Sequence, residues 1–202
     1  MPTGTSRRRL TLAAASALIV VAGAVAANAA NDAGGTDRER ASKRVIKVAL
    51  HDVDGSKVGW VSLRQTRGHV VVRGIARGLT PGFHGFHIHA IGLCEADAPD
   101  GPFTTAGGHF TGGPPNHGDH AGDMPSLLVT ANGHAFSQFV TDRFVLADLR
   151  DTDGSAVMVH EGRDNFANIP RERYSAAGVP GPDATTLKTG DAGDRAACGV
   201  ID

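Results

Sequence analysis

Short segments of alternating apolar and polar residues run through the chain from Arg44 onward, and glycine-containing turns interrupt them. Alternation with a period of two is typical of half-buried β-strands. The 27 glycines among 202 residues are nearly twice the usual share of about 7%, and together with ten prolines they favour many turns over long helices. The pattern predicts an all-β domain, an antiparallel sandwich or barrel, with strands over residues 45–50, 58–63, 69–75, 86–91, 127–130, 135–141, 156–160 and 198–201.

Two long stretches separate these strands. Residues 92–125 and 161–195 are rich in glycine, proline and aspartate and show no periodicity. Long loops of this kind in a compact domain are usually functional. We therefore expect the two long loops to carry the activity.

The N-terminus resembles an export signal. Arg7, Arg8 and Arg9 precede an apolar, acid-free run, and Ala27-Asn28-Ala29 supplies the small-x-small pattern that signal peptidases cleave. The arrangement predicts a signal peptide over residues 1–29 and a secreted or otherwise extracytoplasmic mature protein. An uncleaved anchor is the alternative, and the arginine triplet leaves both the general and the twin-arginine export routes open.

Removal of the leader changes the net charge from -1 to -4, since the leader carries three arginines and no acids. This balance gives no electrostatic reason to expect a nucleic-acid partner. No apolar run in the mature chain is long enough to span a bilayer. Small and charged residues follow the leader, so we expect residues 30–43 to form a flexible segment and residues 44–202 to form the folded domain.

Histidines mark one predicted strand. His87 and His89 lie two residues apart, so both imidazoles face the same side of that strand. Such a pair alone also fits surface or buried core histidines.

The first long loop adds a denser group: His109, His117, His120 and Asp123 fall within fifteen residues. Three nitrogens and one carboxylate suit tetrahedral zinc and leave no position for a substrate, which is typical of a structural site. A polar loop that happens to hold three histidines is the alternative.

A further histidine ends another predicted strand. His160 is followed four residues later by Asp164, a carboxylate of the kind that orients metal-bound imidazoles. Imidazoles without a thiolate also suit copper, which changes oxidation state where zinc does not. A copper site and a zinc site are therefore both candidates.

Several separated motifs together resemble the copper/zinc superoxide dismutase family of the secreted bacterial type. The matching segments run from Val45 to Ile201 and include residues 82–89, 107–110, 117–123, 159–161 and 189–201. The resemblance implies a Greek-key β-sandwich or barrel of about eight strands. It also implies two metals. Copper would be bound by His87, His89, His109 and His160. Zinc would be bound by His109, His117, His120 and Asp123, so that His109 is shared.

The resemblance also implies roles outside the ligand sets. Asp164 would link His87 to His117, and Arg195 would line the copper site and hold the superoxide anion. Lys188 and Arg163 are further candidates for steering this anion.

Cys94 and Cys198 are the only cysteines. An exported chain meets an oxidising compartment, so we expect one intramolecular disulfide, with free or intermolecular thiols as the alternative. The family pairs these two positions in the same way.

The function implied is superoxide dismutation outside the cytoplasm, with copper and zinc as cofactors and protons supplied by His109 and water. The competing hypothesis is an exported protein that buffers copper or zinc without turnover. Arg195 argues against a buffer, because a buffer gains nothing from a fixed cation beside a cationic metal. A homodimer is left open.

Overall fold

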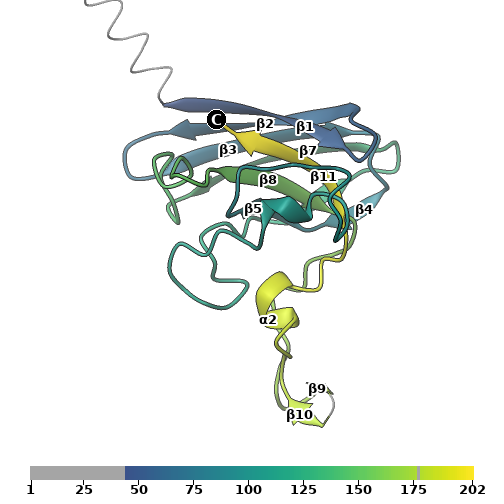
Figure 1. Ribbon diagram of the computed structural model, residues 1–202. Helices are drawn as coiled ribbons and strands as arrows, with labels where there is room; N and C mark the ends of the chain where they lie inside the picture. The colour runs from purple at the N-terminus through teal and green to yellow at the C-terminus, as the bar shows by residue number, and fades with distance from the viewer. Residues whose placement is uncertain (1–43, 177) are drawn as a thin grey trace, which may run out of the picture. The chain divides into compact units, whose positions relative to one another are not determined.

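The computed structural model describes residues 44–176 and 178–202, so the predicted signal peptide and the segment over residues 30–43 lie outside the described residues. Nine of the strands in the described part join in one antiparallel sheet (Figure 1). These strands are β1 (Val45–Asp52), β2 (Lys57–Gln65), β3 (Val70–Arg77), β4 (Gly82–His84), β5 (Phe86–His89), β6 (Leu127–Val129), β7 (His134–Thr141), β8 (Ser155–His160) and β11 (Arg195–Ile201).

The sheet curves into a nearly closed barrel. Its strand order is β4-β6-β7-β3-β2-β1-β11-β8-β5, so β3 pairs with β7 instead of with its successor in sequence, as in a Greek key. The two outermost strands, β4 and β5, are separated in sequence by Gly85 alone. A Cβ atom at Gly85 would lie 2.6 Å from that of Ala192, which only glycine avoids. The chain itself therefore closes the barrel, and Ala192 of the second long loop packs against the connection at Gly85.

The core fills the inside of the barrel as the alternation predicts. On β1, Ile46, Val48 and Leu50 are buried and Lys47 between them is exposed. Burial of each such side chain contributes about 1.5–3 kcal/mol. The same alternation continues along β3, so the predicted strand period is confirmed.

All eight predicted strands are present, with shifts at their ends. The strand predicted over residues 86–91 ends at His89, because the N–H groups of Ala90 and Ile91 donate to carbonyls of the first long loop instead of to a neighbouring strand. The final strand begins at Arg195, three residues earlier than predicted. Strand β4 was not predicted.

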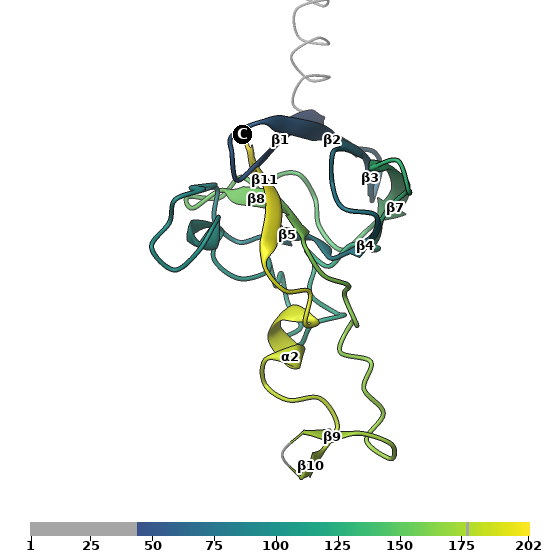
Figure 2. The same ribbon diagram turned by 90° about the vertical axis from the view of Figure 1, so that its right-hand side faces the viewer.

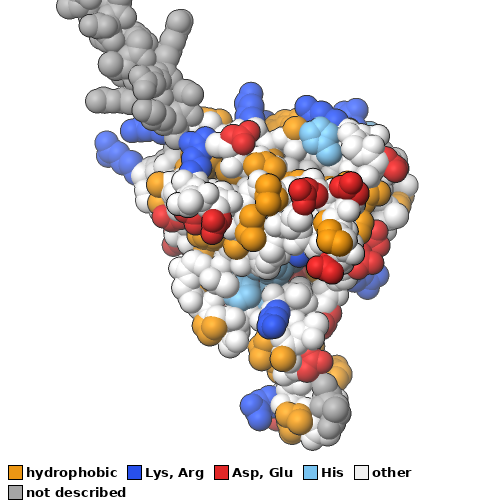
Figure 3. Space-filling model, viewed as in Figure 1, with side chains coloured by type: hydrophobic (Ala, Val, Ile, Leu, Met, Phe, Trp, Pro, Cys, Tyr) orange, Lys and Arg blue, Asp and Glu red, His pale blue; other side chains and the backbone are white. Residues whose placement is uncertain are grey.

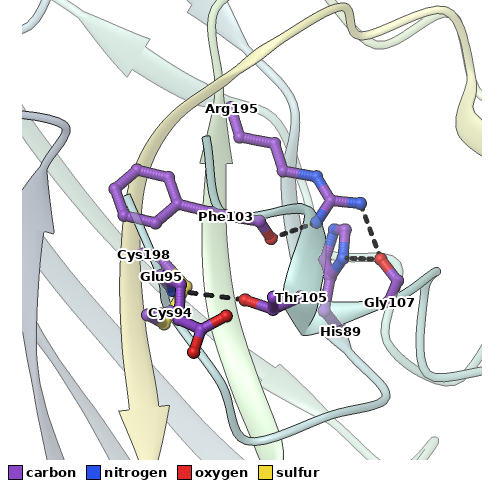
Figure 4. The surroundings of a disulfide bond; sticks show 8 residues. All are labelled: His89, Cys94, Glu95, Phe103, Thr105, Gly107, Arg195 and Cys198. Atoms are coloured by element: carbon purple, nitrogen blue, oxygen red, sulfur yellow. Dashed lines mark hydrogen bonds between the residues drawn. A yellow bond between two sulfur atoms is a disulfide. The ribbon is translucent and has the colours of Figure 1, made fainter. Parts of the chain in front are cut away.

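The first long loop covers the outside of β8. All six residues of β8 are buried, because Met158 and its neighbours pack outside the barrel against Phe103 in a second, smaller core. A 3₁₀ turn, η1 (Thr104–Ala106), follows Phe103. A disulfide joins Cys94 in the loop to Cys198 on β11 with their Cα atoms 5.7 Å apart, as predicted (Figure 4).

The second long loop runs away from the barrel and returns to it. It carries a two-stranded hairpin, β9 (Ser175–Ala176) with β10 (Val179–Pro180), and then the short helix α2 (Thr186–Thr189). Both views show α2 on the side of the barrel away from β1 and β2 (Figures 1 and 2). No helix in the described part of the chain is long and apolar enough to cross a membrane.

Candidate metal centre

Strand β5 aims two histidines away from the barrel core. Phe86 and Ile88 pack inside the barrel, whereas His87 and His89 point to the other face, as the two-residue spacing predicts. Both histidines are nevertheless almost completely buried, with exposed fractions of 0% and 1%. The first long loop buries them, since isolated bridges pair His87 with Asp123 and His89 with His109.

Four buried imidazoles converge where β5, β8 and the first long loop meet. Each offers a ring nitrogen, and these nitrogens all lie within 4.8 Å of one another; the residues are His87, His89, His109 and His160. These are the four residues that the resemblance assigns to copper.

Backbone carbonyls fix the orientation of two of these rings. Nδ1 of His89 donates to the Gly107 carbonyl at 2.9 Å, and Nδ1 of His160 donates to the Gly193 carbonyl at 3.0 Å. A neutral imidazole with Nδ1 protonated carries a lone pair on Nε2. The two Nε2 atoms lie 3.3 Å apart, so two acceptors face each other. A bound cation satisfies both, and the donor set therefore fits a metal.

Burial keeps three of these imidazoles, those of His89, His109 and His160, neutral. It lowers the pKa of His89 well below the ordinary 6.5, and repulsion from His109 and His160 lowers it further. Burial likewise lowers the pKa of His160 to about 3 and that of His109 to about 4, the latter against the opposing effect of the hydrogen bond that His109 donates to Asp123. Neutral imidazoles are the form that binds metal.

A second donor set adjoins the first. Donor atoms of His87, His109, His117 and Asp123 also lie within 4.8 Å of one another. The Asp123 Oδ1 atom is 3.0 Å from Nδ1 of His109 and 3.1 Å from Nδ1 of His117. This grouping contains His87 where the resemblance implies His120.

His120 nevertheless faces the same point. Its Nδ1 lies 3.6 Å from Oδ1 of Asp123. Both ring nitrogens of His120 are buried and have no hydrogen-bond partner among the described residues. A buried, unpartnered imidazole is costly unless a ligand satisfies it, so His120 fits the zinc set.

His109 stands between the two sets. Its Nδ1 faces Asp123 at 3.0 Å, whereas its Nε2 is buried on the other side and has no protein partner in the described part of the chain. One ring thus offers a nitrogen to each donor set. This arrangement agrees with the shared role that the resemblance implies.

The loop over residues 117–123 is held from two sides. The N–H groups of Gly118 and His120 donate to Oδ2 of Asp123 at 2.7 and 3.0 Å, which leaves Oδ1 free to face the imidazoles. Nη1 of Arg143 donates to the carbonyls of the same two residues, both at 3.1 Å. The role of Arg143 was not predicted, because this residue lies twenty residues beyond Asp123 and belongs to no metal motif.

Asp164 connects the two donor sets. Its Oδ2 accepts from Nε2 of His87 and its Oδ1 from Nε2 of His117, both at 2.7 Å. Gly190 packs directly against this contact at a φ of +60°, so a side chain there would strike Asp164 and His117. Gly190 lies within the C-terminal motif over residues 189–201, but its contact with Asp164 and His117 was not predicted.

These contacts move the pKa values of Asp164 and His117 in opposite directions. Burial alone would raise the pKa of Asp164, but the hydrogen bonds from His117 and His87 lower it far below its usual value. Burial alone would lower the pKa of His117, but the hydrogen bonds to Asp123 and Asp164 raise it to about 9. Asp164 is therefore an anion at working pH.

An open pocket of about 630 Å³ leads to these rings. The side chains of His89, His109, His120 and His160 line it together with Arg195 and Lys188, whereas Arg163 does not line it. In the space-filling view, histidine surface is visible at the bottom of a hollow (Figure 3).

The first long loop holds Arg195 in place. Its Nη1 donates to the carbonyl of Phe103 and its Nη2 to the carbonyl of Gly107 at 2.6 Å (Figure 4). A guanidinium stays charged at working pH, even though burial lowers the pKa of Arg195. The structure thus places a fixed cation beside the converging imidazoles.

Comparisons with known proteins agree with this geometry. A family model described as copper/zinc superoxide dismutase (SODC) matches residues 57–201. The chain is 43% identical over 182 residues to a Cu-Zn superoxide dismutase of Mycobacterium tuberculosis, covering 83% of this chain and 74% of the relative. It is 36% identical over 167 residues to that of Photobacterium leiognathi, covering 77% and 86%. The solved structure of the Cu/Zn superoxide dismutase from Brucella abortus superposes with a TM-score of 0.58 at 31% identity, covering 78% of this chain and 99% of that chain.

Proposed function

The chain belongs to the copper/zinc superoxide dismutase family, and from this membership we propose which of its residues carry out the dismutation of superoxide. It is an enzyme, and its cofactors are copper and zinc. We assign copper to His87, His89, His109 and His160. We assign zinc to His109, His117, His120 and Asp123.

Copper supplies the one-electron redox chemistry by which two superoxide anions and two protons become dioxygen and hydrogen peroxide. The chain contributes four imidazoles. Three of them, those of His87, His89 and His160, have one ring nitrogen tied to a protein acceptor, so their other nitrogens need little reorganisation to bind a metal. Asp164 fixes the rings of His87 and His117 together. The zinc residues stiffen the loop that forms one wall of the pocket.

Arg195 holds the anion. Its two hydrogen bonds to loop carbonyls aim the guanidinium into the pocket while its charge attracts superoxide. With zinc held at Nδ1, the one ring proton of His109 would lie on Nε2 whenever that nitrogen is free of copper, and from there it would pass to the reduced anion. The observation that carries the proposal is this fixed cation beside four converging imidazoles.

Metal content and superoxide consumption should be measured in one preparation of the exported form. We expect one copper and one zinc per chain, with activity lost when copper is removed. Full occupancy by both metals without dismutation would place the protein among metal buffers instead.

Two finer points belong to the same proposal. The enzyme acts outside the cytoplasm after loss of residues 1–29, which the mass of the exported protein tests. It forms a homodimer, which the exposed cross-strand pair Phe83 and Leu128 on β4 and β6 supports. Sedimentation of the wild type and of Phe83→Ser tests the dimer.

A further inference from the structure

Charge is segregated along the chain. Residues 44–77 carry seven lysines and arginines and only two acids, whereas residues 78–202 carry seven lysines and arginines and sixteen acids. All seven cations of the first stretch are exposed: Arg44, Lys47, Lys57, Arg64, Arg67, Arg73 and Arg77. Figure 3 shows lysine and arginine side chains along the top of the molecule, where β1 and β2 lie in Figure 1, and acidic side chains across its middle.

The same strands present aromatic rings among these cations. Strand pairing sets Trp60 beside Ile75 and Ile75 beside Phe136, so these three form a row across the outside of β2, β3 and β7. Phe136 is 61% exposed. The Arg73 guanidinium lies 5.8 Å from the centre of a Trp60 ring and 5.5 Å from that of Phe136. We call Lys47, Lys57, Trp60, Arg64, Arg73 and Phe136 the basic-aromatic face.

A shallow hollow opens on this face. It measures about 280 Å³ and lies beside Trp60, with Lys47 and Lys57 both among its lining residues. A phosphate group in such a hollow meets two ammonium groups and an aromatic ring. Of the two acids in this stretch, Asp52 is the last residue of β1 and Asp54 lies in the turn between β1 and β2.

We propose that the basic-aromatic face docks the exported enzyme on the surface of an anionic phospholipid bilayer. Cations attract the lipid phosphates, and the two aromatic side chains suit the boundary between headgroups and acyl chains. A second copy is a poor occupant, because two such faces would set like charges against each other.

Docking in this way leaves the enzyme working. The residues lining the metal pocket come from the two long loops, α2, β5, β8 and the start of β11, and none comes from β1, β2, β3 or β7. In both ribbon views α2 and β1 lie on opposite sides of the barrel (Figures 1 and 2). A bilayer bound along β1–β3 and β7 therefore leaves the pocket open to water.

Trp60 reports on the contact directly, because the chain contains one tryptophan. The exported, metal-loaded enzyme should be titrated with vesicles of phosphatidylglycerol and phosphatidylcholine, and with vesicles of phosphatidylcholine alone. We expect co-sedimentation and a blue shift of Trp60 emission only with the anionic vesicles, together with quenching by brominated acyl chains. Binding should weaken as salt rises, because the charges are exposed.

The double variant Lys47→Gln with Arg64→Gln removes two charges from the face. The matched control, Arg171→Gln with Arg173→Gln, removes two exposed charges from the second long loop near the hairpin. Each cation near an anionic membrane raises the affinity for it about fivefold. The face variant should therefore bind anionic vesicles about 25-fold more weakly than the wild type, and the control should bind them as the wild type does. Dismutase activity in solution should be unchanged in the face variant.

Three results would overturn the proposal. The first is no binding to anionic vesicles at low salt, and the second is an equal loss of binding in the face variant and the control. The third is binding without a shift in Trp60 emission and with equal affinity for soluble polyphosphate, which would identify a polyanion as the partner. Each leaves the dismutase assignment intact, since activity is measured separately.

Discussion

His89 and Arg195 donate hydrogen bonds to the same atom, the carbonyl oxygen of Gly107, at 2.9 and 2.6 Å. A proposed copper ligand and the cation that holds the substrate are thus positioned by one peptide group (Figure 4). A shift of this peptide would move both, so the distance between the anion site and the imidazoles is fixed by the loop.

Replacement of Arg195 separates the binding of the superoxide anion from the binding of copper. Arg195→Ile removes the charge, and we expect kcat/KM for superoxide to fall about ten- to a hundredfold while copper content stays at the wild-type level. Arg195→Lys keeps the charge but has no guanidinium fork to reach both carbonyls, so an intermediate value is expected. Pulse radiolysis and metal analysis of both variants check this. An unchanged kcat/KM in Arg195→Ile would remove Arg195 from the mechanism.

Asp164→Asn tests the connection between the donor sets. The amide retains one acceptor oxygen, so it can orient His87 or His117 but not both. We expect zinc affinity to fall about 10- to 100-fold, as for other residues that orient metal-bound histidines. Competition with a chromophoric chelator measures it. Asp153→Asn, at an exposed loop position, is the control, and equal affinities in the two variants would refute the assignment.

The stability of the metal-free protein should depend on pH in two opposite ways. His109 and His160, with pKa values of about 4 and 3, bind protons more tightly when unfolded, where the ordinary value is 6.5. Their contribution to the free energy of unfolding is full above pH 6.5 and is lost as the pH falls toward 4 and 3. His117, with a pKa of about 9, binds its proton more tightly when folded. The contribution of His117 to the free energy of unfolding is full below pH 6.5 and is lost as the pH rises to 9.

Calorimetry of the metal-free protein should therefore give a maximum Tm near pH 6.5. His117→Asn should abolish the decline on the alkaline side and leave the acid side in place. A Tm that is constant from pH 6.5 to 9 in the wild type would contradict the role given to His117.

Removal of the disulfide should weaken both fold and activity. Cys94 and Cys198 are 104 residues apart in sequence, and in chain-entropy terms closing such a loop contributes up to about 4.7 kcal/mol. The double variant Cys94→Ser with Cys198→Ser should unfold at a lower denaturant concentration than the wild type. Its kcat/KM should also fall, because the pinned loop supplies both carbonyls that hold Arg195. A variant less stable but fully active would show that the loop holds Arg195 without the disulfide.

The strands were predictable because their alternation is a local property of the sequence. Strand β4 escaped because three residues, one of them glycine, are too short to show a period, and it forms only through pairing with β6. The hairpin β9–β10 escaped for the same reason.

The family was predictable from the spacing of the histidine motifs, and the comparisons confirm it. The backbone groups that hold the site's side chains in place were not predictable. His89, His160 and Arg195 are held by carbonyls of Phe103, Gly107 and Gly193, and a backbone acceptor leaves no signature in the sequence. Which carbonyl lies within reach depends on how the loops fold over β8.

Arg143 is a side chain that holds the site without a signature in the sequence, and its contribution to zinc binding can be measured. It binds the carbonyls of Gly118 and His120 while Asp123 binds their N–H groups, so the loop is fixed on both sides of the same two peptides. Arg143→Ala removes one side. We expect zinc to dissociate about tenfold faster, because the loop must reorder at each binding event.

Cobalt placed in the zinc site gives a second measurement, since its visible absorption reports ligand geometry. Arg143→Ala should broaden and shift this spectrum, and Arg143→Lys should restore part of it, since a lysine can reach one carbonyl. Arg150→Ala is the matched control, because Arg150 lies on the same connection between β7 and β8 but binds the carbonyl of Asp202. Identical cobalt spectra and zinc release rates in the two alanine variants would show that Asp123 alone is sufficient to shape the loop.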